Sequence, residues 1–293
     1  MKLAALPAEV RGIVAVLAAM VMFGLMDGAS KFLAETGYSP AQILFLRYLF
    51  SVPVAMAIVA PVGLRVAIRT HRPFFQLLRV IILVTEMGLV LLAFRVMPLA
   101  DAHALFAATP LLVTALSMPL LGERVGPRRW AAVLVGFVGV MIIVRPGLVQ
   151  LHAGTIWALV SMAMYAVYQV MTRIVARVDR PETIFFVQIV VGSILLLPFA
   201  PWVWVTPPLT HWPFFLLLAA LGAGGHLLLI KALSLAPVVV IQPFTYTMLL
   251  WAVLFGWLFF ADIPDGWTLL GAAIVIAAGL YTAIREHRLR MRR

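Results

Sequence analysis

The chain has 293 residues, of which 64% are hydrophobic and 11% are charged, whereas a soluble domain carries about 25% charged residues. So little charge cannot cover the surface of a water-soluble globule of this size, so the composition favours an integral membrane protein. The absence of cysteine excludes disulfides, thiolate catalysis and cysteine-ligated metal sites. The net charge of +11 has to be interpreted from its distribution.

Ten apolar stretches follow one another along the chain, and about 20 such residues cross a bilayer as a helix. They cover approximately residues 11–33, 40–60, 74–94, 98–120, 129–145, 154–174, 182–200, 212–231, 237–260 and 266–285. Proline, glycine and charged residues separate most of them, and the connections leave no room for a soluble domain. Because an open strand would leave backbone groups unpaired in lipid, we predict an all-α integral membrane protein with ten transmembrane helices.

The second half of the chain repeats the first. Residues 71–78, His-Arg-Pro-Phe-Phe-Gln-Leu-Leu, return at 211–218 as His-Trp-Pro-Phe-Phe-Leu-Leu-Leu. A near-constant shift of about 140 residues along apolar helices indicates a duplicated unit. Five helices per unit is an odd number, so the second unit enters the membrane from the opposite side. We therefore predict one membrane domain built as a 5+5 inverted repeat, 1–147 and 148–293, around a central cavity.

The basic residues predict the topology. If the N-terminus is cytoplasmic, most of the 22 Lys and Arg lie on the cytoplasmic side. Only Arg95 and Arg145 lie at outer ends, while Lys31, Arg47 and Arg79 fall within helices. This bias places both termini in the cytoplasm. It also accounts for the net charge, so we expect a lipid bilayer and no nucleic acid as the partner.

Several short motifs carry a resemblance to a known family. They are Phe23-Gly24 with Lys31, residues 40–47, Pro110, Gly122-Glu123, Trp130 and Gly136-Phe-Val-Gly139, with weaker echoes at Tyr165-Ala166, Arg173 and Ala261-Asp262. Together with ten helices they resemble the EamA-type family of the drug/metabolite transporter superfamily. The resemblance implies a ten-helix bundle that exports or exchanges small metabolites without ATP. Length and helix count look like the bacterial branch that exports amino acids, including aromatic ones, across the inner membrane.

Four ionisable residues fall inside predicted helices: Asp27, Lys31, Arg47 and Glu86. Charges are costly in a bilayer, so such groups usually face partners, water or substrate. The predicted helix directions place all four in the same half of the membrane. They could form a charged wall that contacts a zwitterion or moves during gating or coupling, or an ion-pair network that locks the helices. For Lys31 and Arg47 we expect the second role, in an ion-pair network.

Prolines and polar side chains predict the cavity. Pro110 and Pro243 lie within the fourth and ninth helices, at equivalent places in the two halves, and internal proline kinks a helix. The candidate cavity residues are His103, Tyr165, Tyr168, Gln169, Gln242, Tyr246 and Trp251. They suit a small amphipathic or aromatic substrate, although rings can also pack between helices. His103 could couple proton movement to transport or pack between helices.

The sequence therefore predicts a secondary transporter that exports small metabolites, amino acids including aromatic ones among them, by alternating access. The alternatives are an intramembrane enzyme, a non-transporting scaffold and a permease for drugs or other metabolites. No serine lies at a useful spacing from a base, and no His-x-x-x-His or Glu-x-x-His spacing supports a metal site. We predict no catalytic residue, metal or cofactor, and the sequence leaves the oligomeric state open.

Overall fold

The computed structural model describes residues 6–121, 127–145 and 152–290. The Gly122-Glu123 motif lies outside these residues. Within them the chain forms α-helices, two short 3-10 turns (Leu197–Phe199 and Leu209–His211) and connecting loops. The helices are α1 (Ala8–Glu35), α2 (Pro40–Val59), α3 (Leu64–Ala67), α4 (Pro73–Phe94), α5 (Leu99–Phe106), α6 (Thr109–Leu121), α7 (Pro127–Val144), α8 (Ala153–Val175), α9 (Pro181–Leu196), α10 (Ala200–Val203), α11 (Trp212–Leu235), α12 (Val238–Thr245), α13 (Thr247–Phe260) and α14 (Gly266–Arg290).

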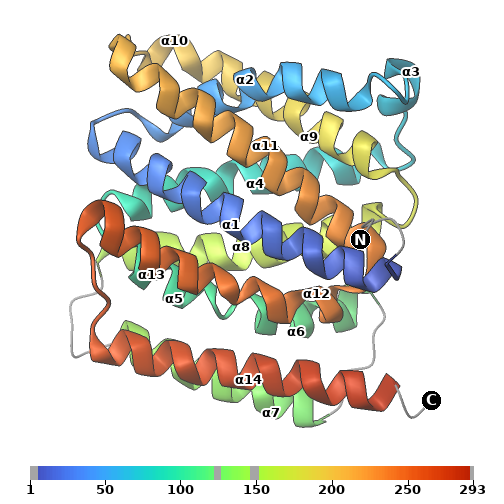
Figure 1. The fold of residues 1–293 in the computed structure, drawn as a ribbon, viewed down its shortest axis with the longest axis vertical. Helices are drawn as coiled ribbons and strands as arrows, with labels where there is room; N and C mark the ends of the chain where they lie inside the picture. The colour runs from blue at the N-terminus through green and yellow to red at the C-terminus, as the bar shows by residue number, and fades with distance from the viewer. Residues whose placement is uncertain (1–5, 122–126, 146–151, 291–293) are drawn as a thin grey trace.

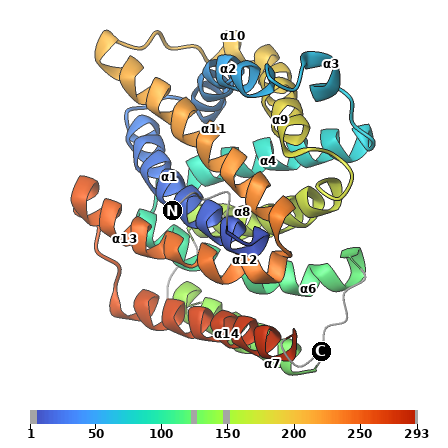
Figure 2. The same cartoon turned by 45° about the vertical axis from the view of Figure 1, so that its right-hand side comes forward.

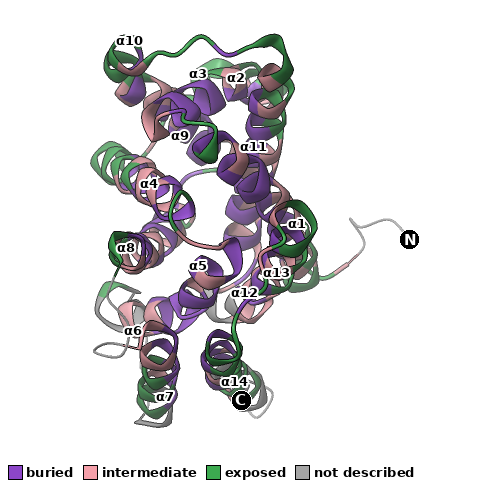
Figure 3. Cartoon of the chain, turned by 90° about the vertical axis from the view of Figure 1, so that its left-hand side faces the viewer, coloured by how far each residue is buried: buried purple, intermediate pink, exposed green. Residues whose placement is uncertain are grey.

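The described part of the chain contains eight helical segments that are long and apolar enough to span a membrane. Two further helices, α7 and α14, carry shorter apolar stretches at Trp130–Val144 and Gly266–Tyr281. Large apolar side chains lie exposed on the outer faces of the bundle, among them Leu134 and Leu250. Figure 3 shows exposed residues on the outside and buried ones facing inward. The prediction of an all-α membrane protein is confirmed, and the count of ten spans stays a prediction.

Helices of the first half pack against helices of the second half. α1 packs along α11, α4 along α8, α2 along α9 and α7 along α14 (Figures 1 and 2). Glycines permit several of these contacts, because a Cβ atom on Gly225 of α11 would come within 2.6 Å of the Phe23 ring on α1. Likewise, Gly139 of α7 and Gly271 of α14 face each other, and the absence of side chains lets the two helix backbones approach closely. Most of the core is therefore shared between the two halves.

Two membrane segments are interrupted in the same way. α5 and α12 each begin directly after a proline, Pro98 or Pro237, in nearly the same backbone conformation. The first segment breaks at 107–108, where Pro110 has no N–H to donate to the carbonyl of Phe106. The second breaks at Tyr246, and the Thr247 hydroxyl donates to the Phe244 carbonyl at 2.7 Å. Both breaks lie inside the bundle rather than at its ends.

The bundle has two ends that differ in the segments they carry. α1 begins and α14 ends on the same side of the molecule, the right-hand side of Figure 1. The loops before α4 and before α9 also lie on that side, whereas the loops before α2 and α14 lie on the other. The interrupted helices place their breaks between these two ends.

Candidate functional site

A central cavity of about 130 Å³ lies between the two halves. Residues from α1, α2, α4, α5 and α6 line it on one side, and residues from α8, α11 and the α12–α13 break line it on the other. Its walls are mainly aromatic rings and methionines: Met20, Phe23, Met26, Met87, Phe94, Phe106, Tyr165, Tyr246 and Met248. A largely apolar cavity with a few polar groups is the usual form of a small-molecule site.

Four ionisable side chains from the first half line this cavity. Nε2 of His103 lies 3.1 Å from Oδ2 of Asp27. Arg47 and Glu86 also line the cavity and are at most 6% exposed. Among the described residues, neither Arg47 nor Glu86 makes a side-chain hydrogen bond or an ion pair within 4 Å. A buried charge without a partner is costly, and such groups usually face water, a partner or a substrate.

The position of Arg47 depends on a glycine. A Cβ atom on Gly222 of α11 would lie only 2.5 Å from Nε of Arg47. The guanidinium therefore occupies the space that a side chain at 222 would need. The second half of the chain supplies the room for a cation carried by the first half.

Aromatic side chains form a layer behind the cavity wall. The Tyr165 ring lines the cavity and stacks on Tyr168, with 5.8 Å between ring centroids. Tyr168 is fully buried, and its hydroxyl donates to Gln188 at 2.9 Å. Tyr246 lines the cavity, and its buried hydroxyl has no hydrogen-bond partner among the residues that the structure describes.

The structure brings together many of the residues singled out from the sequence. Those that line the cavity are Asp27, Arg47, Glu86, His103, Pro110, Tyr165, Gln169 and Tyr246. Tyr168 lies behind the wall, Trp251 packs against Gly24 of α1, and Pro243 lies within α12. The side chain of Gln242 lies outside the described residues.

Lys31 differs from the other charged residues of the sequence prediction, because it points away from the cavity. Its Nζ lies 2.6 Å from Oδ2 of Asp262, in the loop after α13, and 3.7 Å from Oε1 of Glu35. It also donates to the Met97 carbonyl at 3.4 Å and lies 5.0 Å from the Phe260 ring. This Lys31–Asp262 pair joins the two halves at the end of the bundle where α1 ends. The sequence did not predict Asp262 as its partner.

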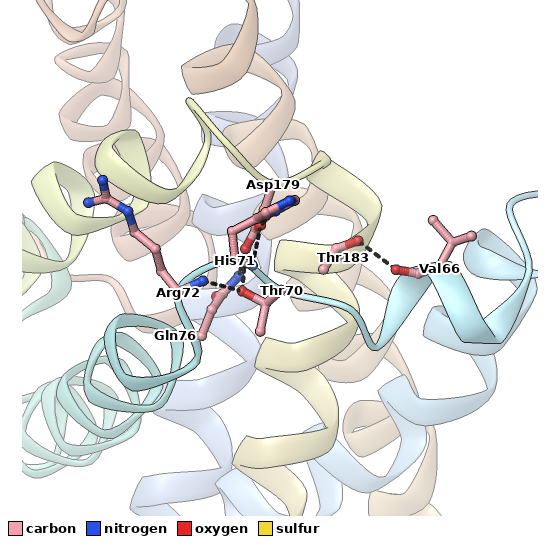
Figure 4. Close-up of polar contacts among 7 residues, drawn as sticks. All are labelled: Val66, Thr70, His71, Arg72, Gln76, Asp179 and Thr183. Carbon is pink, nitrogen blue, oxygen red and sulfur yellow. Dashed lines mark hydrogen bonds and ion pairs between the residues drawn. The ribbon is translucent and has the colours of Figure 1, made fainter.

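A second cluster joins the halves at the opposite end (Figure 4). Asp179, in the loop before α9, accepts hydrogen bonds from the Thr70 hydroxyl, from the His71 N–H at 2.9 Å and from Gln76 at 3.1 Å. Nδ1 of His71 lies 2.8 Å from Oδ1 of Asp179. Burial opposes ionisation of Asp179, but these hydrogen bonds outweigh it and hold the pKa of Asp179 below its usual value.

The sequence placed Arg79 within a helix but did not single it out as a site residue, and it lies next to this cluster. Arg79 is fully buried, and its guanidinium donates to Gln76, to Gln188 at 2.8 Å and to the Ile184 carbonyl at 3.0 Å. The cluster around Asp179 therefore continues, through Gln76 and Arg79, to the layer behind the cavity. The contact of Arg79 with Gln188 on α9 is recognised only once the helices are paired.

Metal chemistry has no support among the residues that the structure describes. No group of three or more His, Asp or Glu side chains is placed there to hold a metal ion. The arrangement can bind a small molecule, and it offers one cation, two carboxylates and several ring faces for that purpose.

Comparisons with known proteins give the family of the chain, its relatives and a shared fold. The sequence profile of the EamA-like transporter family matches residues 10–145 and 152–284. The chain is 30% identical to a riboflavin transporter of Rhizobium johnstonii, over 92% of this chain and 89% of that protein. It is 25% identical to an S-adenosylmethionine uptake transporter of Rickettsia prowazekii, over 96% and 95%. A solved crystal structure shares the fold, with a TM-score of 0.69, 17% identity and coverage of 95% and 98%.

Proposed function

The chain belongs to the EamA-like transporter family, and on that premise we propose that it is a secondary transporter for small ring-bearing metabolites. It works by alternating access around the central cavity. The observation that carries the proposal is the cavity itself, which lies between the two halves and presents Arg47 and Glu86 without partners among the described residues. Buried charges without partners destabilise a protein that serves only as a scaffold, whereas a transporter can use them to bind its substrate.

The helix pairing supports a 5+5 inverted repeat of residues 1–147 and 148–293. If α1 corresponds to α8 and α4 to α11, the contact of α1 with α11 repeats as the contact of α8 with α4. The interrupted segments α5–α6 and α12–α13 correspond in the same way. Two similar units of opposite orientation can exchange conformations, so one cavity opens to each side in turn.

The clusters at the two ends support alternating access. The Lys31–Asp262 pair and the hydrogen bonds of Asp179 each join one half to the other, and the cavity lies between them. Opening either end separates the residues that hold it closed. The carrier then needs only to break one cluster while it keeps the other.

The charge distribution supports a cytoplasmic location for both termini. α1 begins and α14 ends on the same side of the bundle as the loop before α9 (Figure 1), which carries Asp179. Arg65, Arg69, Arg177 and Arg180 lie in or beside the loops of that side, as the positive-inside rule requires. The bacterial relatives support a bacterial inner membrane as the location.

The cavity supports a substrate that carries a ring and both signs of charge. Rings and methionines form its walls, Arg47 can bind an anionic group, and Asp27 and Glu86 can bind an ammonium group. Aromatic amino acids fit this description, as does S-adenosylmethionine, which one relative's name gives as its substrate. Riboflavin, named for another relative, carries the ring without the charges.

The direction of transport stays open between export, which the sequence predicted, and uptake, which the names of the Rickettsia relatives state. A carrier that alternates access can run either way as the gradients dictate.

Counterflow in proteoliposomes tests this function without assuming a direction. Purified protein is reconstituted, loaded with an unlabelled compound and exposed to the labelled one, using L-tryptophan, S-adenosylmethionine and riboflavin in turn. We expect saturable accumulation of at least one of them, in wild type and in the lipid-facing control Ile194→Ala. Flux that neither saturates nor accelerates on preloading would indicate a channel. No flux of any of the three would refute the proposal.

A further inference from the structure

A second, smaller space lies directly beside the central cavity. It has a volume of about 10 Å³ and is lined by residues of α2, α9 and α11: Arg47, Tyr48, Ser51, Gln188, Ile189, Gly222, Ala223 and His226. Arg47 and His226 line both spaces, so the side chamber and the central cavity meet at these two residues. We call this smaller space the side chamber. A volume of about 10 Å³ admits one water molecule or one oxygen atom of a larger ligand.

The amide of Gln188 presents an unused donor to the side chamber. Its Oε1 accepts from Arg79 at 2.8 Å and from the Tyr168 hydroxyl at 2.9 Å. These two donors fix which branch of the amide is the oxygen. The NH2 group therefore lies on the opposite branch, and Nε2 is buried with no hydrogen-bond partner among the residues that the structure describes.

Arg47 adds further donors to the side chamber. The Arg47 guanidinium can donate five hydrogen bonds and accept none, and it makes none to the described residues. The Ser51 hydroxyl is used, since it donates to the Arg47 carbonyl at 2.7 Å. Nδ1 of His226 is buried, again with no partner in the described part of the chain. The donors there without a partner among the described residues are therefore Nε2 of Gln188 and the Arg47 guanidinium.

Resting on the transport function proposed above, we infer that the side chamber binds one carboxylate oxygen of the substrate, so the preferred substrates are α-amino carboxylates with a ring. A carboxylate is an acceptor-only group, which matches Gln188 Nε2 and Arg47. Asp27 and Glu86 line the central cavity beyond Arg47 and take the ammonium end. The ring then lies against the aromatic and methionine walls.

Wild-type protein gives the first test, with the probes L-tryptophan, L-tryptophanamide and tryptamine competing for counterflow in proteoliposomes. Tryptophanamide and tryptamine keep the ring and the ammonium group and lack the carboxylate. We expect L-tryptophan to compete at least tenfold more strongly than either of them. Equal competition by the three overturns the inference, and so does transport of riboflavin without transport of any carboxylate-bearing compound. In both cases the transport function itself survives.

Two variants assign this preference to the side chamber. Gln188→Glu keeps an oxygen for Arg79 and Tyr168 but replaces the free NH2 group by an acceptor that repels a carboxylate. Ala223→Val fills the chamber without changing its charge. Each variant should lower the competition by L-tryptophan at least tenfold and leave tryptamine within twofold of wild type. Ser193→Ala, on the same helix as Gln188, is the control, because its hydroxyl serves only the Ile189 carbonyl.

The outcomes separate the inference from the proposed function. A preference for L-tryptophan that persists in both variants, or an equal loss for all three probes, means that the chamber holds only a structural water and overturns the inference. If Gln188→Glu does not fold, Ala223→Val and the comparison of the three probes in wild type still test the inference. If no probe and no metabolite moves at all, the proposed function fails and the inference fails with it.

Discussion

The ion pair between Lys31 and Asp262 should hold one end of the carrier closed. Its 2.6 Å contact joins a lysine side chain that is 5% exposed to an aspartate side chain that is 22% exposed. Removing one partner of a buried pair costs roughly 3–5 kcal/mol. Glu35, the Met97 carbonyl and the Phe260 ring remain near Lys31, so Asp262→Asn should cost roughly 3 kcal/mol, the low end of that range.

If opening this end separates the pair, Asp262→Asn destabilises the closed state and leaves the open state unchanged. Since 1.4 kcal/mol is a factor of ten, a loss of roughly 3 kcal/mol should raise the open population roughly 100-fold. The chain has no cysteine, so Ala107→Cys, on the cavity wall, provides a single label site without background. We expect Asp262→Asn to accelerate its reaction with an impermeant maleimide in right-side-out vesicles by this factor.

The double variant Lys31→Met/Asp262→Asn separates closure from stability. It leaves no unpaired buried charge, so the melting temperature should return close to that of wild type while labelling stays fast. A lower melting temperature for Asp262→Asn with an unchanged labelling rate would refute the reasoning. The pair would then brace the bundle without closing it.

Three further predictions concern the other end and the cavity. Because hydrogen bonds depress the pKa of Asp179, its contribution to stability is complete above about pH 4 and disappears as pH falls through the lowered value. Asp179→Asn should therefore melt below wild type at pH 7, and the difference should shrink as pH falls through the lowered pKa of Asp179. Gly222→Ala should displace Arg47 and weaken substrate competition at least tenfold. The control Gly88→Ala, where a Cβ meets open space, should not weaken it. Equal effects of the two variants would contradict the placement of Arg47. Glu86→Gln should reduce counterflow at least tenfold without a lower melting temperature, and normal counterflow would remove Glu86 from the mechanism.

The fold class could be predicted from the sequence because the signals for membrane helices are local. Apolar stretches punctuated by proline and glycine are read one helix at a time, and lipid permits little besides helices. The interruption near Pro110 is equally local, since a missing N–H disturbs its own helix. The break at Tyr246 is harder to predict from the local sequence, because Pro243 lies within α12 and the helix breaks three residues later.

The partners of charged residues could not be predicted in the same way. Helix direction placed Asp27, Lys31, Arg47 and Glu86 at similar depth, but depth does not say which way a side chain points around the helix. Lys31 turns toward Asp262, which is 231 residues away in the chain. Such contacts depend on the packing of the two halves, which no single helix encodes.

The same limit applies to the buried glutamines. Gln188 looks like an isolated polar residue in an apolar helix until Arg79 and Tyr168 are seen to use its oxygen. Its free donor is a property of three helices together. A polar residue at the centre of an apolar stretch is the one signal that could have drawn attention to it.

The distances across the two ends of the bundle give the most direct test of the central claim that one cavity opens to each side in turn. Spin labels at Glu35 and Ile263 span the Lys31–Asp262 end, and labels at Ile68 and Val178 span the Asp179 end; all four sites are exposed. Alternating access predicts two distance populations at each end in a bilayer, and a transported compound should shift the two ends in opposite directions. Fixed distances at both ends, or simultaneous widening of both, would contradict the account.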